Sequence, residues 1–187
     1  MLEEIDHQYL LSLGFDGVGV RDPEKLLRRL RSREGQVAVQ LLKPELVAGA
    51  EHLRFAAKNA IHSFNGKRRR SKSLAVEYLL YLSCQRQISK AISFMGIQPS
   101  DRQVILVALS ESKEALERLA TEVPSFIGGT VDPELIENAS KRKLGGLQRA
   151  YGVSEKEVEA ARFQGETDRE VVKRLIVERS ALLDLED

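Results

Sequence analysis

Apolar positions in the middle of the chain follow two patterns, and both predict helices. In residues 44–64 they recur every three or four positions, which predicts a long helix with one face in the core, ended by Asn65-Gly66. Residues 74–82 are apolar on every side except at Glu77, so they predict a helix that is buried all around. This helix of about three turns is too short to span a membrane, which needs roughly 20 apolar residues.

Runs of leucine and β-branched residues predict the strands of a small sheet. Residues 104–109 (VILVAL) form the strongest run, and residues 37–42 (VAVQLL) form the next. Near the N-terminus, residues 10–13 and 18–20 allow a strand or hairpin, with glycines in a turn between them.

Shorter helices are predicted from capping residues and apolar faces. Asp22-Pro23 begins the first, and Ser83 can cap another whose apolar residues Ile88, Ala91, Ile92 and Met95 share one face. Further helices are expected at residues 113–122, in one or two pieces at 133–151, after Ser154 and at 170–183. The 187 residues therefore predict an α/β fold, a small mixed or antiparallel sheet packed with a helical bundle in a single domain, residues 1–187.

Basic residues are clustered although the whole chain is nearly neutral. The net charge is +1, so attraction to nucleic acid must come from local groups of cations. One such group is Arg28, Arg29, Arg31 and Arg33. The densest, between the two central helices, is Lys67, Arg68, Arg69, Arg70 and Lys72. Residues 66–72, which carry it, are named the basic loop.

The basic loop is a candidate RNA-binding site. Several phosphate contacts from it would give a salt-dependent affinity. On the preceding helix, His52, Phe55 and His62 form a second line that could stack unpaired bases. A solvated surface loop is the competing interpretation, because most runs of charge are simply hydrated.

Residue spacing argues against a metal or nucleotide site. His52 and His62 are ten residues apart, about 15 Å along a helix, which is too far for two ligands of one ion. The glycines at 14, 17 and 19 match neither nucleotide-binding fingerprint and predict a turn. We therefore expect no metal and no cofactor.

Two residues remain as candidates for chemistry. Cys84 is the only cysteine, so it excludes an internal disulfide, and at a helix junction it is expected to pack as a small residue. With the acidic N-terminal residues, it favours a soluble, cytoplasmic protein. Glu77 is expected to be paired, with Arg86 or a loop arginine, because an unpaired buried carboxylate costs several kcal/mol; catalysis or a binding role is the alternative.

The two central helices and the strand after them resemble a known family. LVAGAEHLRFAAKNAIHSF (46–64), SLAVEYLLYLSCQRQISKAISFMGI (73–97) and VILVAL are similar to the kinase-binding accessory subunit of the KEOPS complex, especially its archaeal form. The final stretch VVKRLIVERSALLDLED is similar to that family's last helix. In this family the position of Cys84 is expected to hold a smaller residue, often glycine.

The resemblance implies a subunit that is not an enzyme. Members of the family bind the small kinase/ATPase-like subunit of KEOPS, which takes part in threonylcarbamoyl-adenosine modification of tRNA, and the archaeal subunit binds the 3′ CCA end of tRNA. We expect this chain to hold RNA with the basic loop, Arg86, His52, Phe55 and His62. The last helix offers a candidate kinase-docking stripe: Val172, Leu175, Ile176, Leu182 and Leu183.

Other interpretations stay open at this point. The stripe on the last helix could merely close the core, as such stripes usually do. The protein could be a stand-alone RNA-binding protein in which a kinase plays no part. It could also be a small enzyme that uses Glu77 or Cys84.

Overall fold

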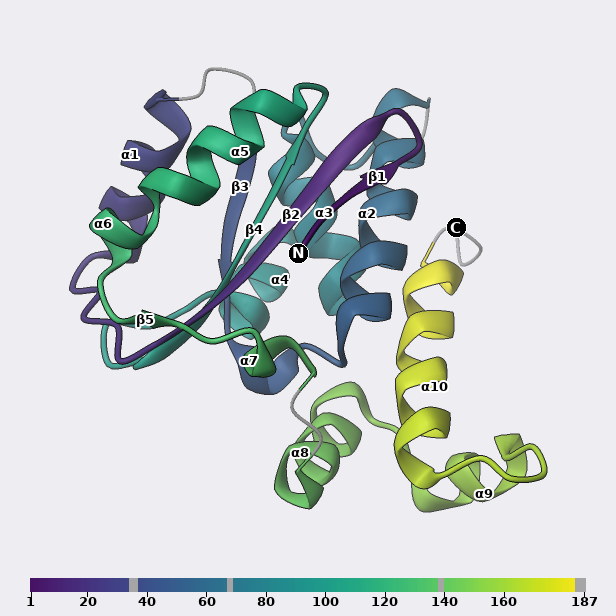
Figure 1. Cartoon of the computed structure of the whole chain (residues 1–187). Helices are drawn as coiled ribbons and strands as arrows, with labels where there is room; N and C mark the ends of the chain where they lie inside the picture. The colour runs from purple at the N-terminus through teal and green to yellow at the C-terminus, as the bar shows by residue number, and fades with distance from the viewer. Residues whose placement is uncertain (34–36, 67–68, 138–139, 184–187) are drawn as a thin grey trace.

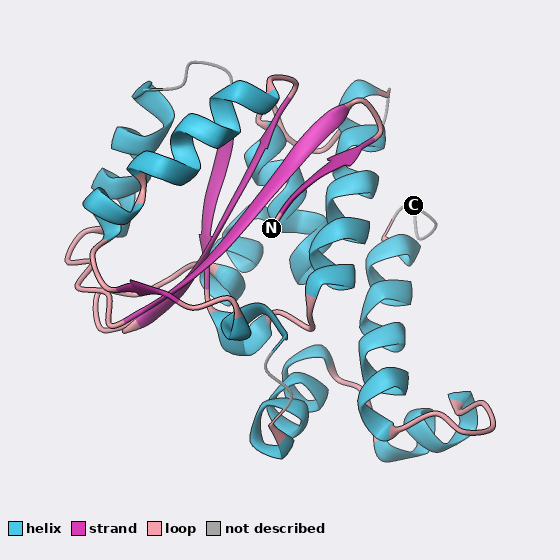
Figure 2. Ribbon diagram, in the orientation of Figure 1, coloured by secondary structure: helices cyan, strands magenta, loops and turns pink. Residues whose placement is uncertain are grey.

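A computed structural model describes residues 1–33, 37–66, 69–137 and 140–183, and it contains an antiparallel sheet between two groups of helices (Figures 1 and 2). The strand order is β1 (Leu2–Ile5), β2 (Gln8–Asp16), β4 (Gln103–Ser110) and β3 (Ala38–Leu42). The short β5 (Thr130–Val131) pairs with β2. All pairings are antiparallel, so the α/β class with a small antiparallel sheet is confirmed.

Helices cover both faces of the sheet. One face packs on α1 (Pro23–Arg33), α5 (Lys113–Glu122) and α6 (Pro124–Ile127), and the other on α2 (Ala50–Asn65), α3 (Leu74–Ser83) and α4 (Ile88–Met95). In β4, residues 104, 106 and 108 enter the first core and residues 105, 107 and 109 enter the second. A strand covered on both faces is apolar throughout, which is why VILVAL was the strongest strand signal.

The N-terminal hairpin differs from its prediction. The turn lies at Asp6 and His7, which have φ values of 47° and 66°, and β2 then continues through Gly14 to Asp16. Gly14 lies inside β2, paired with Ile105, at a position that only glycine fits, because a Cβ there would collide with the main-chain oxygen of Asp132. The predicted break at this glycine was therefore wrong, and residues 18–20 form no strand.

The helix predicted from Pro44 begins later than expected. Pro44–Leu46 form an isolated 3₁₀ turn, η1, and α2 starts only at Ala50 after Gly49, whose φ is 113°. The Ala50 N–H donates to the carboxylate of Glu137 at 2.7 Å, which satisfies one free donor at the helix start. Glu137 ends the short α7 (Glu134–Glu137).

The junction between α3 and α4 also departs from prediction. Ser83 is the last residue of α3, and its hydroxyl donates to the Leu80 carbonyl. The next helix, α4, begins only at Ile88, so Ser83 does not cap it as predicted. In α4, Ala91 and Met95 are buried, but Ile88 and Ile92 are 41% and 49% exposed. The four residues share one side of α4 by their spacing, but only Ala91 and Met95 are buried there.

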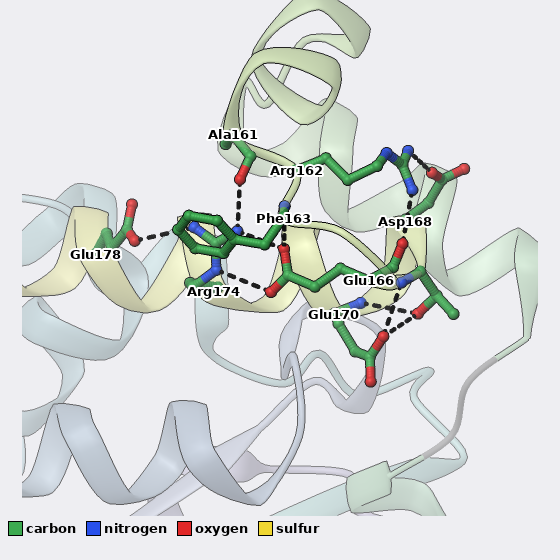
Figure 3. A network of polar contacts seen from close by, with 9 residues as sticks. Ala161, Arg162, Phe163, Glu166, Asp168, Glu170, Arg174 and Glu178 are labelled. Carbon is green, nitrogen blue, oxygen red and sulfur yellow. Dashed lines mark hydrogen bonds and ion pairs between the residues drawn. The ribbon is translucent and has the colours of Figure 1, made fainter.

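Three helices after α7 form a smaller, third core. These are α8 (Lys141–Tyr151), α9 (Glu155–Ala161) and α10 (Asp168–Leu182), and α10 packs along α2. Ser154 begins α9 with a capping box, as predicted. Figure 3 shows the polar network between α9 and α10, in which the guanidinium of Arg174 donates to the Ala161 carbonyl and to Glu166. The Arg174 guanidinium carbon also lies 4.6 Å from the centre of the exposed Phe163 ring.

Tyr151 connects this third core to the rest of the protein. Its ring is buried at the end of α8, and its hydroxyl lies 2.9 Å from the Leu46 carbonyl and 3.1 Å from the Leu82 carbonyl. Leu46 belongs to η1 and Leu82 to α3.

Among the residues described, no helix is long and apolar enough to cross a membrane.

Candidate functional site

Glu77 anchors the basic loop from beneath. This residue in the first turn of α3 is 0% exposed, and its carboxylate accepts hydrogen bonds from the main-chain N–H of Arg70 (3.1 Å) and of Ser71 (2.8 Å). It also accepts one from the Ser63 hydroxyl of α2 at 2.7 Å. The carboxylate thus joins the end of α2, the loop and the start of α3. Such contacts compensate the desolvation of a buried charge.

Arg70 extends this anchor to the last helix. Its guanidinium donates to the carbonyl oxygen of Leu183, just after the end of α10, at 3.0 Å. A cation is favourable there because the carbonyls at a helix C-terminus carry partial negative charge. Arg70 therefore has a structural contact, while its main chain is held by Glu77.

The remaining described cations of the loop face solvent. Arg69 and Lys72 are exposed, and the Arg69 guanidinium carbon lies 5.9 Å from the Phe64 ring centre. Lys67 and Arg68 lie outside the described residues. Arg86 is exposed but follows the far end of α3, whose 10 residues span about 15 Å, so it is not brought to the basic loop.

Two of the three residues proposed to contact bases do lie on one open face of α2. Phe55 is 44% exposed, and His62 is exposed two turns further toward the basic loop. The Nε2 atom of His62 lies 2.9 Å from Asp6 in the first hairpin. Phe55 and His62 thus form an accessible face that leads toward the basic loop.

His52 is separated from this face. Its side chain is 1% exposed, its Nδ1 accepts a hydrogen bond from the Ala48 N–H at 3.2 Å, and its ring meets the Tyr151 ring edge-on at 5.7 Å. Burial lowers the pKa of His52 from 6.5 to about 4. The structure therefore places His52 in the interior as a neutral residue, and no base can reach it in this conformation.

Most of the stripe predicted on α10 is also interior. Val172 and Ile176 are fully buried and Leu183 is 5% exposed. Leu175 is half-buried, and Leu182, 46% exposed, is the accessible end of the stripe. As a docking surface, α10 therefore offers little apolar area.

Cys84 occupies a position with left-handed backbone geometry. Its φ is 53° and ψ 32° at the end of α3, a conformation that glycine adopts without strain. The sulfur lies 3.8 Å from the Ile176 carbonyl, and burial raises the pKa of the thiol to about 12. The thiol is therefore protonated at neutral pH, which is unfavourable for a nucleophile.

A protein-family model matches residues 18–184, and its description is Kinase binding protein CGI-121. The chain belongs to this family. The resemblance drawn from the two central helices and the strand after them is thereby confirmed. The backbone of Cys84 also gives a physical reason why glycine is expected at this place in CGI-121 proteins.

The sequence patterns missed one surface of this CGI-121 protein. A groove of about 520 Å³ lies between α1, the edge strand β3, α3 and α4. The exposed Ile92 is among the residues that line it. The sequence signal for this surface was the spacing of Ile88 and Ile92, which lie one turn apart on a helix of eight residues in which Ala91 and Met95 are buried.

The part of the chain that the structure describes holds no group of three or more histidine, cysteine, aspartate or glutamate side chains that could bind a metal ion.

Proposed function

We propose that this chain is a non-catalytic KEOPS subunit that binds the kinase/ATPase-like subunit and recruits tRNA for threonylcarbamoyl-adenosine modification. The observation that carries the proposal is the family match over residues 18–184. The family's description, a kinase binding protein, supports a kinase partner, and the motifs in the two central helices support the KEOPS assignment.

The geometry of the basic loop supports the RNA part of the proposal. Arg69 and Lys72 are exposed on either side of Arg70 and Ser71, whose main-chain N–H groups are held by the Glu77 carboxylate. Phe55 and His62 offer an aromatic face on the adjoining helix. Proteins bind an unpaired RNA end with both kinds of side chain, because cations contact the phosphates and aromatic rings stack on the bases. The 3′ CCA end of tRNA is the single strand that we assign to this surface.

The contribution to modification would be positional. A subunit that binds both tRNA and the kinase raises the effective concentration of tRNA near the kinase, although it contributes no reacting group. The binding experiment compares intact tRNA with tRNA lacking CCA, each with and without the kinase subunit. Tighter binding of intact tRNA, increased by the kinase, supports the proposal. Equal affinity for both RNAs contradicts the CCA assignment, and no effect of the kinase favours the alternative of a stand-alone RNA-binding protein.

Charge reversal in the loop gives a direct prediction. The double change Arg69→Glu and Lys72→Glu should weaken tRNA binding by about tenfold or more and reduce the salt slope of log K by about 2, because two phosphate contacts are lost. The measurement is a tRNA titration at several salt concentrations.

A matched control separates local contacts from net charge. Lys25→Glu and Lys156→Glu change the net charge by the same amount at exposed positions on α1 and α9. This control should shift affinity much less. Equal losses in both double variants would show that the loop has no specific role.

A further inference from the structure

A pocket of about 580 Å³ lies where α8 meets η1 and α7. Pockets of this size accommodate small molecules. Among the described residues that line it are three cations of α8, Arg142, Lys143 and Arg149, and one carboxylate, that of Glu45 in η1. Two positive charges are therefore in excess, which favours an anion with two negative charges.

A glycine stands between the two arginines on the pocket side of α8. Arg142, Gly146 and Arg149 follow at intervals of four and three residues, which places them on one face of the helix. Glycine inside a helix lowers its stability relative to alanine. The described fold does not require this glycine, because a Cβ at residue 146 would meet nothing within 4 Å beyond its chain neighbours and its own helix backbone. The missing side chain instead leaves the helix surface open to a bound molecule.

The two arginines of the pocket are not used by the described part of the fold. Both are exposed, and no described residue forms a hydrogen bond or ion pair with the guanidinium of Arg142 or Arg149. By contrast, Arg174 of α10 pairs with Glu166 at 2.8 Å. A guanidinium group matches the geometry of a phosphate, which it can bind through two parallel hydrogen bonds.

Lys143 is the half-buried cation of the pocket. Its Nζ donates to the carbonyl oxygen of Leu135 in α7 at 3.3 Å, and Leu135 also lines the pocket. Burial is the largest cause that lowers the pKa of Lys143 from 10.5 to about 8. A bound anion would favour the charged form of this amine and raise its pKa again.

We infer that this pocket binds the phosphate group of a small phosphorylated molecule, with Arg142, Lys143 and Arg149 as its cations. The inference goes beyond the proposed function, which names only a protein and an RNA as partners. An unpaired RNA end is disfavoured, because no described residue that lines the pocket is aromatic and such RNA is bound largely by stacking. The pocket also adjoins η1, which precedes α2, whereas the basic loop follows the other end of α2, a helix of 16 residues about 24 Å long (Figure 1).

Calorimetric titration of the full chain with inorganic phosphate, pyrophosphate and AMP tests the inference directly. We expect saturable binding of each. Equal affinity for phosphate and AMP supports a site that recognises the phosphate alone, and tighter binding of AMP supports a nucleotide as its source. Absence of saturable binding of all three would overturn the inference.

Filling the pocket separates it from other basic surfaces. Gly146→Leu places a side chain in the pocket and should raise Kd for pyrophosphate by about tenfold or more. The control is Gly145→Ala, outside the lining, whose Cβ would lie at an ordinary contact distance of 3.5 Å from the Arg149 guanidinium. It should leave Kd within about twofold. Both changes replace a helical glycine, and thermal melts verify that both variants are folded. Unchanged binding by Gly146→Leu would overturn the inference.

A second pair of variants tests the charge of the pocket. Arg142→Gln with Arg149→Gln should raise Kd for pyrophosphate by about tenfold or more. Lys25→Gln with Lys156→Gln, an equal change in net charge at exposed positions outside the lining, should leave it within about twofold. The pocket variant should bind tRNA as the unsubstituted protein does. Equal losses of pyrophosphate binding in both pairs, or lost tRNA binding in the pocket variant, would overturn the inference and leave the proposed function standing.

The amine of Lys143 gives a readout that depends on pH. The charged groups that act on it from the neighbouring elements are Lys173 and Arg169 of α10, Glu137 of α7 and Glu45 of η1. Because phosphate favours the protonated amine, affinity should fall as pH rises through about 8, the pKa of Lys143 in the free protein. Between pH 7 and pH 9, Kd should rise about tenfold relative to Lys143→Gln, which has no titrating amine. Parallel pH profiles of the two proteins would overturn the assignment of Lys143 to the site.

Discussion

Replacing Glu77 with alanine should lower the free energy of unfolding by about 3 kcal/mol, because three buried or half-buried donors lose their acceptor. These are the Ser63 hydroxyl and the main-chain N–H groups of Arg70 and Ser71. The cavity that remains at a fully buried position adds to the loss. Urea denaturation followed by circular dichroism measures the change.

Glu77→Gln keeps the size of the side chain but replaces one acceptor oxygen by an NH₂ donor. It should lose about half as much stability as the alanine variant, because one of the two oxygens is retained. The matched control is Ser73→Ala, at the N-cap of the same helix, where the structure shows no side-chain cap hydrogen bond. The control should change stability by less than about 0.5 kcal/mol. A comparably small loss in Glu77→Ala would contradict the role assigned to the carboxylate.

Between pH 7 and pH 5 the protein should lose about 2 kcal/mol of stability through His52. Burial lowers the pKa of His52 to about 4 in the folded protein, while the unfolded value stays near 6.5. Between these values the unfolded chain binds the proton and the folded chain does not, so stability falls as pH falls. The loss should therefore begin near pH 6.5 and level off below pH 4.

The measurement is urea denaturation at a series of pH values for the unsubstituted protein and for His52→Gln. The variant should show a flatter profile between pH 7 and pH 5, because glutamine does not titrate. His62→Gln is the control on the same helix, at an exposed position beside Asp6. If the profiles of the unsubstituted protein and His52→Gln run parallel, His52 is not buried as a neutral residue.

Local sequence patterns correctly predicted those helices and strands whose local preference agrees with their tertiary contacts. The strand at 104–109, the buried helix α3 and the capped helix α9 follow directly from hydrophobic runs and capping residues. The expectation that the buried carboxylate of Glu77 must be paired also holds. Its partners, however, include main-chain N–H groups of the basic loop, which no side-chain pattern could specify.

The failures at His52 and Gly14 share one cause, which is contact with a distant segment. Helical periodicity placed His52 on the same line as Phe55, but α8 brings Tyr151 over it. The same limit applies to Gly14, which lies close to Asp132 in the segment before α7. Spacing predicted one shared face for Ile88, Ala91, Ile92 and Met95, but it could not show that Ile88 and Ile92 remain 41% and 49% exposed.

The hydroxyl of Tyr151 has a consequence for how the protein unfolds. It reaches carbonyl oxygens of both η1 and α3, so the three C-terminal helices cannot separate from these two elements without exposing two main-chain acceptors. The same ring also packs edge-on against Phe94 of α4 at 5.2 Å. Loosening of the C-terminal helices should therefore be coupled to loosening of the central ones, giving one cooperative melting transition instead of two.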